Sequence, residues 1–176
     1  MENKKGKAQL NRLFVELHVP DFSIAEDFYK KLGFEIVSYD KVYNGLGYFL
    51  MQRGETIINF YGGSDKVYEQ SFFKKFPKGT PRGCEVELTI PTDNIDEYFK
   101  AVKMNIPDSI VQELMKKTDK KSDTKEFVWR DFRVEDPFGF YLRFTEPIFW
   151  KECYCGSNKD YKKCHGKQNY NNRSQG

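Results

Sequence analysis

The stretch that decides the fold covers residues 13–37 and reads LFVELHVPDFSIAEDFYKKLGFEIV. Its first residues alternate between apolar and more polar side chains, which predicts a strand with one buried face. The apolar positions are Leu13, Val15, Leu17 and Val19. The residues that follow predict an amphipathic helix, whose apolar stripe comprises Ile24, Phe28 and Leu32. A second strand begins after Gly33-Phe34, so this stretch is a strand–helix–strand unit.

The composition limits the classes of protein to consider. The chain has 176 residues, enough for one domain with a small appendage or for two fused half-size modules. It contains no apolar run of about 18 residues that would span a membrane. The first residues, MENKKGKAQLNR, are charged and lack the apolar centre of a signal peptide. We therefore expect a cytoplasmic protein.

The net charge of +3 is unevenly distributed. Residues 1–12 carry +3 and residues 151–176 carry +4, so residues 13–150 carry −4. An acidic body thus has two basic ends. Basic ends of this kind contact nucleic acid, ribosomes or acidic proteins in some chains and are simply solvated in others.

The rest of the first half predicts two more strands, over residues 48–52 and 56–61, joined by a hairpin turn at Arg53-Gly54-Glu55. A connecting helix is expected over residues 66–76. Residues 77–83, PKGTPRG, contain two prolines and are expected to link the halves.

The second half repeats this order. A strand over residues 85–90 precedes a helix over residues 94–104, for which Asp93 or Asn94 is the expected N-cap. Residues 109–115 fit either a strand or a helix, and residues 116–125 are expected to form a charged turn or loop. Strands are expected over residues 126–134 and 141–145, around a turn at residues 136–139.

The two halves therefore form an internal repeat. Asp21 and Phe28-Tyr29 in the first half correspond to Asp93 and Tyr98-Phe99 in the second. Neither half covers its own apolar face. We expect an α+β fold of paired βαβββ modules, residues 12–65 and 84–147, that form curved mixed sheets around a cleft.

This pattern resembles the glyoxalase/bleomycin-resistance/dioxygenase superfamily, also called vicinal oxygen chelate proteins. The resemblance covers residues 12–147 and is carried by VPDF…DFYKKLGF, by YFLMQRGETIINFY and by DPFGFYLRF. The second of these is similar to the bleomycin-resistance branch. The resemblance implies a bacterial protein with the paired-module fold, assembled as a homodimer.

Enzymes of this superfamily hold a divalent metal with His and Glu side chains from four strand positions. The resemblance places Phe14, Asn59, Glu85 and Arg143 at these positions. Only one of the four side chains could serve as a metal ligand, and an Arg would repel the cation. His18 is expected to point away from the face of Phe14. Glu85 and Arg143 are expected either to pair with each other or to face solvent.

The resemblance therefore favours a protein that binds a small molecule without chemistry. Aromatic side chains would stack on the ligand and polar ones would orient it. The candidate ligand-binding residues are Phe14, Asn59, Tyr61, Glu85, Trp129 and Arg143, and further aromatic candidates are Phe60, Phe127 and Phe132. Two alternatives stay open: a metal-dependent lyase or dioxygenase, and an adaptor with a vestigial cleft.

The C-terminal segment reads CYCGSNKDYKKCHGK and gathers the candidate metal ligands Cys153, Cys155, Cys164 and His165. Three thiolates and one imidazole complete a closed tetrahedral zinc site, which is structural rather than catalytic. The segment resembles the SEC-C zinc-binding motif. We expect this motif over residues 151–168, between the main domain and a tail of residues 169–176, with residues 1–11 as a basic N-terminal tail. The resemblance implies that the motif docks onto a protein or the ribosome.

Overall fold

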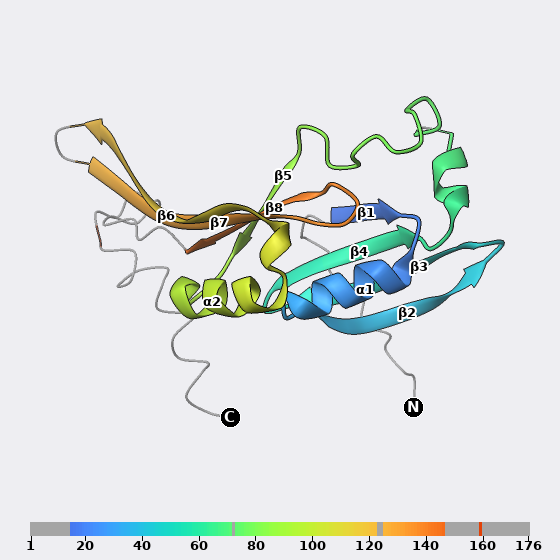
Figure 1. Cartoon of the computed structure of the whole chain (residues 1–176), viewed down its shortest axis with the longest axis horizontal. Coiled ribbons are helices and arrows are strands. Elements are labelled where there is room, and N and C mark those ends of the chain that lie inside the picture. Colours follow the sequence, from blue (N-terminus) through green and yellow to red (C-terminus); the bar gives the residue numbers. More distant parts are fainter. Residues whose placement is uncertain (1–14, 72, 123–124, 147–158, 160–176) are drawn as a thin grey trace, which may run out of the picture. The chain divides into compact units, whose positions relative to one another are not determined.

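The computed structural model describes residues 15–71, 73–122, 125–146 and 159. The chain divides between Arg82 and Gly83 into two compact units. In its described part, each unit contains a four-stranded sheet with an α-helix on one face (Figure 1). Within these residues, neither helix is long and apolar enough to cross a membrane.

The first unit has the strand order β1-β4-β3-β2, in which β1 and β4 are parallel and the other pairs are antiparallel. Helix α1 connects β1 to β2, and a short 3₁₀ helix follows β4. The elements are β1 (Val15–Val19), α1 (Phe22–Lys31), β2 (Glu35–Tyr43), β3 (Leu46–Arg53), β4 (Thr56–Gly62) and η1 (Asp65–Glu69).

The second unit repeats this topology with the strand order β5-β8-β7-β6, and β5 and β8 are parallel. Its elements are β5 (Glu87–Pro91), α2 (Ile95–Asn105), η2 (Pro107–Ser109), β6 (Ile110–Ser122), β7 (Lys125–Glu135) and β8 (Tyr141–Glu146). The predicted α+β class with two βαβββ modules is confirmed. Residues 110–115, which the sequence left open between strand and helix, are part of strand β6.

The repeat extends to the aromatic contacts of the two cores. In the first unit Phe49 and Phe60 stack with ring centroids 4.6 Å apart, and Tyr29 of α1 meets Phe60 edge-on at 4.8 Å. In the second unit Phe132 and Phe144 stack at 5.2 Å, and Tyr98 of α2 meets Phe144 edge-on at 5.1 Å. These are favoured aromatic geometries. In both modules, therefore, an edge-on contact between a tyrosine of the helix and a phenylalanine of the sheet packs the helix against the sheet.

The two helices begin differently. The Asp21 carboxylate accepts hydrogen bonds from the backbone N–H groups of Ser23 (2.8 Å) and Ile24 (3.1 Å), which caps α1. The expectation of Asp93 or Asn94 as the N-cap of α2 is met by Asn94. Its backbone is left-handed, with φ of 52°, and its side chain makes no capping bond.

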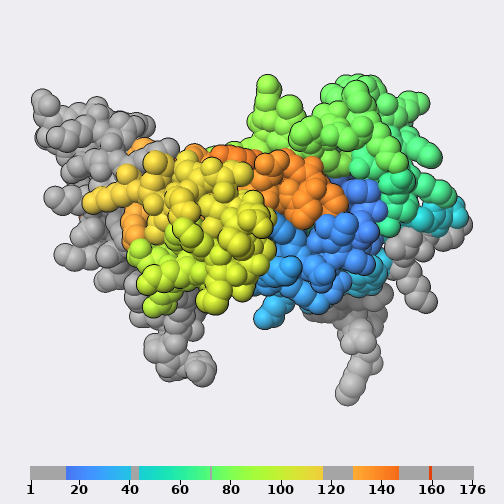
Figure 2. All heavy atoms as spheres, in the orientation of Figure 1, coloured from blue at the N-terminus to red at the C-terminus, as the bar shows by residue number. Residues whose placement is uncertain are grey.

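Two helical expectations are wrong. Ile24 is 47% exposed and does not belong to the apolar stripe of α1, because Phe22, Ala25 and Tyr29 join Phe28 on the buried side. The helix expected over residues 66–76 is limited to η1, in which only Val67 is buried. Residues 74–78 are exposed, and the green segment to which they belong lies on the surface (Figure 2).

The prediction of a charged turn or loop over residues 116–125 is also wrong. Strand β6 continues to Ser122 and pairs with β7 in a register that ends with Ser122 opposite Lys125. Strand pairing uses backbone groups, so a charged sequence can extend a two-stranded ribbon at the edge of a sheet.

Gly62 ends β4 at a point where the chain has no room for a side chain. Its φ is +124°, and a Cβ there would overlap the carbonyl oxygen of Val19 on the neighbouring strand. That oxygen accepts a hydrogen bond from the N–H of Gly63 at 2.9 Å. The parallel pairing of β1 with β4 therefore requires glycine at this position.

We predict that Gly62→Ala lowers the free energy of unfolding by about 3 kcal/mol, because it adds both backbone strain and a clash. Gly54→Ala is the matched control. Gly54 has φ of +57°, but a Cβ at this position would meet no atom within 4 Å, so only the left-handed backbone penalty of about 1 kcal/mol is expected. Urea unfolding measures both, and equal losses would contradict the prediction.

Candidate functional site

Each sheet has a polar face opposite the face that its helix covers. Side chains alternate along a strand, so a strand with large apolar residues on one side directs its other residues to the opposite side. In β4, Ile58 and Phe60 are buried and alternate with polar residues. We call the two helix-free surfaces the first polar face, which carries Glu16, His18, Tyr48, Asn59 and Tyr61, and the second polar face, which carries Glu87, Gln112, Trp129, Asp131, Arg133 and Arg143.

The Glu16 carboxylate organises the first polar face. One of its oxygens accepts a hydrogen bond from Nε2 of His18 at 2.8 Å, and the other accepts one from Nδ2 of Asn59 at 2.9 Å. The register of β1 and β4 places Glu16 beside Asn59 and His18 beside Tyr61. The parallel pairing thus brings together two short sequence segments that lie 43 residues apart.

Aromatic rings lie around His18, which bonds this carboxylate. The His18 ring lies 4.9 Å from the Tyr61 ring and 4.7 Å from the Phe73 ring, both edge-on, and Tyr48 lies 4.8 Å from Tyr61. The pKa of Tyr48 is raised, first by burial and then by the negative charge of Glu16 and the neighbouring Tyr61. The first polar face therefore combines a negative charge with flat apolar surfaces.

Two polar atoms on this face are buried and, within the described part of the chain, accept no hydrogen bond. They are Nδ1 of His18 and Oδ1 of Asn59. A buried polar atom without a partner costs about 1–3 kcal/mol, so such atoms need an explanation such as a bound molecule.

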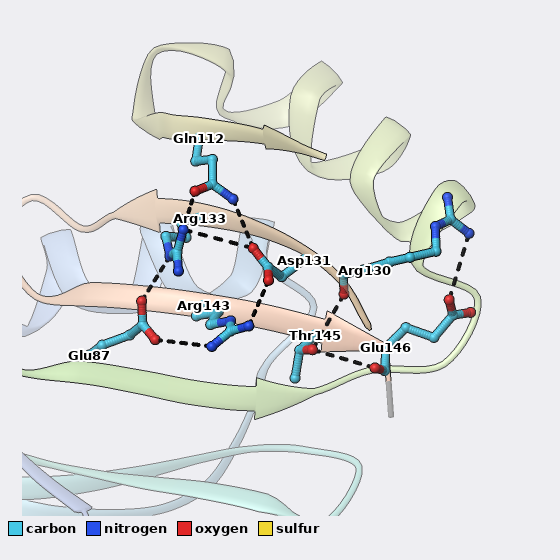
Figure 3. A network of polar contacts seen from close by, with 8 residues as sticks. All are labelled: Glu87, Gln112, Arg130, Asp131, Arg133, Arg143, Thr145 and Glu146. Atoms are coloured by element: carbon cyan, nitrogen blue, oxygen red, sulfur yellow. Dashed lines mark hydrogen bonds and ion pairs between the residues drawn. The ribbon is translucent and has the colours of Figure 1, made fainter. Parts of the chain in front are cut away.

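A buried carboxylate organises the second polar face (Figure 3). Asp131 is fully buried. Its Oδ1 accepts a hydrogen bond from Nε2 of Gln112 at 2.8 Å, and its Oδ2 accepts one from Nη2 of Arg143 at 2.6 Å. A fully buried carboxylate is normally found only with such partners.

Two arginines and two carboxylates close this network. Arg133 donates from Nε to Glu87 at 2.8 Å and lies 3.8 Å from Asp131, and it also contacts the side-chain oxygen of Gln112. Arg143 lies 3.5 Å from Glu87. Burial alone would lower the pKa of Arg133, but the hydrogen bond to Glu87 and the charges of Glu87 and Asp131 raise it on balance. Figure 3 shows the four charged groups side by side.

This face also has polar atoms that are buried and unused by the residues that the structure describes. They are Nε of Arg143 and Nε1 of Trp129, both N–H donors. The two faces thus differ in kind, because the unused atoms are acceptors on the first face and donors on the second.

The predicted site residues do not all lie at one site in the structure. Asn59 and Tyr61 lie together on the first polar face, and Trp129 and Arg143 lie on the second. Glu85 precedes strand β5, which begins at Glu87, and has φ of 59°. Of the two alternatives for Glu85, pairing with Arg143 or facing solvent, the structure shows the second: Glu85 is exposed, and Glu87 pairs with Arg143. Phe60 and Phe132 are fully buried in the cores and are wrong as ligand-binding candidates.

The remaining candidates lie outside the described residues. These are Phe14, the side chain of Phe127, and the zinc ligands Cys153, Cys155, Cys164 and His165. They stay predictions.

The sequence reasoning missed Glu16, His18, Asp131 and Arg133. The ring of His18 bonds Glu16, which also bonds the candidate residue Asn59. The expectation that His18 points away from the face of Phe14 stays a prediction, because Phe14 lies outside the described residues. The signal was present: residues 16 and 18 are two positions apart on one strand and therefore share a face. Asp131 and Arg133 show the same spacing around the buried Phe132.

The described residues do not fit the divalent metal that the resemblance implies. The expected ligand positions hold an amide at Asn59 and a guanidinium at Arg143, and Glu85 lies off the strand. The carboxylates of the second face already pair with Arg133 and Arg143. Among the described residues, no group of three or more His, Cys, Asp or Glu side chains is placed to hold an ion. We therefore assign no step to a metal on these faces.

Comparison with solved structures gives the class of fold. A hypothetical protein, SA1046 from S. aureus, matches with a TM-score of 0.55 and 18% identity over 78% of this chain and 95% of that one. A bleomycin-binding protein complexed with bleomycin matches with a TM-score of 0.51 and 20% identity, covering 78% of this chain and 98% of its own.

A glyoxalase/bleomycin resistance protein/dioxygenase from Alicyclobacillus acidocaldarius matches with a TM-score of 0.50 and 16% identity, over 78% of this chain and 91% of its own. No protein-family model matches the chain, and no curated protein matches it. The chain thus has the fold of the bleomycin-binding and glyoxalase/dioxygenase proteins, which confirms the resemblance at the level of fold.

We predict that Asp131→Asn lowers the free energy of unfolding by about 3 kcal/mol, because Arg143 and Arg133 lose the buried charge between them. Asp96→Asn is the control. It breaks the exposed pair between Asp96 and Arg130, and such pairs contribute little. Chemical unfolding of both variants checks this, and a loss for Asp131→Asn no larger than that of the control would refute a structural role for the network.

Proposed function

We propose that this protein binds small organic molecules, on one or the other of its polar faces, and does not transform them. The observation that carries the proposal is the set of buried polar atoms unused within the described residues, namely Nδ1 of His18, Oδ1 of Asn59, Nε of Arg143 and Nε1 of Trp129. Those of His18, Asn59 and Arg143 lie beside aromatic or charged side chains. Ligand sites of proteins combine apolar area with a few polar groups of this kind.

The bleomycin-binding relative supports this proposal. Its fold is shared by this chain, and it was solved with bleomycin bound. The side chains at the positions that the superfamily's enzymes use for metal argue in the same direction, because an amide and a guanidinium orient a ligand by hydrogen bonds but do not ligate a cation well. In this proposal the protein works as a homodimer, as the sequence resemblance implies.

We predict saturable binding of metal-free bleomycin to the full chain by isothermal titration calorimetry, with the drug recovered unchanged by mass spectrometry. Trp129→Leu is expected to weaken binding at least about tenfold, because it removes a stacking surface and an N–H donor. Lys100→Ala, an exposed position on α2, is the control and is expected to leave affinity unchanged.

If the calorimetric titration shows no saturable heat, the proposal that the protein binds a bleomycin-type ligand is refuted. A chemically altered drug would refute binding without chemistry. Equal affinities of the two variants would remove Trp129 from the site.

The second part of the proposal is a zinc-stabilised docking motif at the C-terminus, formed by Cys153, Cys155, Cys164 and His165. The support is the spacing in the sequence, which supplies four ligands of the kind that structural zinc requires. The basic residues around these ligands would offset the charge of three thiolates and would suit an acidic protein or the ribosome.

We predict about one zinc per purified chain by plasma mass spectrometry, as expected for one four-ligand site. The double variant Cys153→Ser/Cys164→Ser should lose the metal, since serine is a poor zinc ligand. Cys84→Ser is the control, because Cys84 is exposed and lies outside the motif. Retention of zinc by the double variant would contradict the proposed ligand set.

A further inference from the structure

The first polar face has a negative charge without a cationic partner among the described residues. Glu16 is 40% exposed at its side chain and bonds only His18 and Asn59 in this part of the chain. The carboxylates of the second polar face, by contrast, each pair with arginine. The first face can therefore attract a cation from solution, whereas the second is already neutralised.

The hydrogen bonds to Glu16 fix which atoms of its neighbours are available. A carboxylate only accepts, so Nε2 of His18 carries the proton and donates it. In the neutral imidazole, Nδ1 is then an acceptor. For the same reason the Asn59 amide turns its nitrogen to Glu16 and leaves Oδ1 as an acceptor.

The two unused atoms beside the carboxylate are therefore both acceptors. The Tyr48 and Tyr61 hydroxyls can accept as well as donate. A ligand that satisfies this group must bring several hydrogen-bond donors, and N–H donors on a cation also meet the charge of Glu16. An anion or a ligand that only accepts would leave buried acceptors unpaired and would be repelled by Glu16.

The aromatic rings of the first polar face add a second preference, for the shape and charge of the ligand. His18 and Tyr48 both lie less than 5 Å from the Tyr61 ring, at 4.9 and 4.8 Å between centroids, and together they offer flat surfaces for a planar or cationic group. The pKa of Tyr48 is raised first by burial and then by the negative charge of Glu16, and the same negative charge attracts a cation.

We propose that the first polar face binds a planar organic cation rich in N–H donors, of the amidinium or guanidinium class. Its N–H groups bond the Glu16 carboxylate, Nδ1 of His18 and Oδ1 of Asn59, and its plane lies against the tyrosine rings. This inference rests on the proposed small-molecule binding and names the chemical class of the group that the first face recognises.

The test is isothermal titration calorimetry, in which the full chain is titrated with three probes of similar size. Benzamidine carries a planar charged group with N–H donors, benzamide is its neutral counterpart, and benzyltrimethylammonium is a cation without N–H. We expect benzamidine to bind at least about tenfold more tightly than either of the others, the difference that charge-assisted hydrogen bonds typically produce.

The variant Glu16→Gln keeps the shape of the side chain and its acceptor oxygen but removes the charge. It should weaken benzamidine binding about tenfold. Glu26→Gln is the matched control, since Glu26 lies on α1 of the same unit and pairs with Lys30 at 2.5 Å. It changes the net charge equally and should leave affinity unchanged. Urea unfolding shows whether both variants remain folded.

Several results would overturn the inference: no benzamidine binding to the wild-type chain, equal binding to Glu16→Gln, or benzyltrimethylammonium binding as tightly as benzamidine. If bleomycin still binds in that case, the proposed function stands and the cation site is wrong. If benzamidine binds in a Glu16-dependent way and bleomycin does not, the cation site stands and the bleomycin-type function is wrong.

Discussion

The alternation of side chains along the strands is the constraint on which the rest of this structure depends. Phe60 packs against α1 in the first unit, and Phe144 packs against α2 in the second. The residues next to them on each strand must therefore project from the opposite face. Asn59 and Arg143 are those residues. The aromatic core therefore does more than stabilise each module, because it also determines which positions can contact a ligand.

The two modules use this same constraint for different chemistry. In the second, Asp131 and Glu87 are neutralised by Arg133 and Arg143, so the face is a closed charge network with spare donors. In the first, Glu16 keeps its charge and its neighbours keep spare acceptors. An internal repeat in the fold thus carries two surfaces with different hydrogen-bonding groups, one with spare acceptors and one with spare donors.

The sequence predicted the module order and topology because these follow from apolar periodicity and from the turn residues at positions 53–55 and 136–139. The sequence did not predict the roles of residues whose surroundings depend on strand pairing and on contacts between distant segments. Glu85 and Glu87 have similar local surroundings in the sequence, and only the start of β5 selects Glu87. Phe60 and Tyr61 are both aromatic, and only the helix contact assigns Phe60 to the core. The uncompensated charge of Glu16 depends on its neighbours in space, which a single sequence does not reveal.

The acceptor surface of the first polar face depends most directly on the proton of one imidazole. A long-range ¹H–¹⁵N spectrum of the labelled protein at mildly alkaline pH, with the His18→Gln variant used for assignment, reports which ring nitrogen carries it. We predict a proton on Nε2 and a bare Nδ1 whose resonance moves when benzamidine is added. A proton on Nδ1 in the free protein would contradict this, because His18 would then not donate to Glu16 and the first polar face would lose Nδ1 as an acceptor.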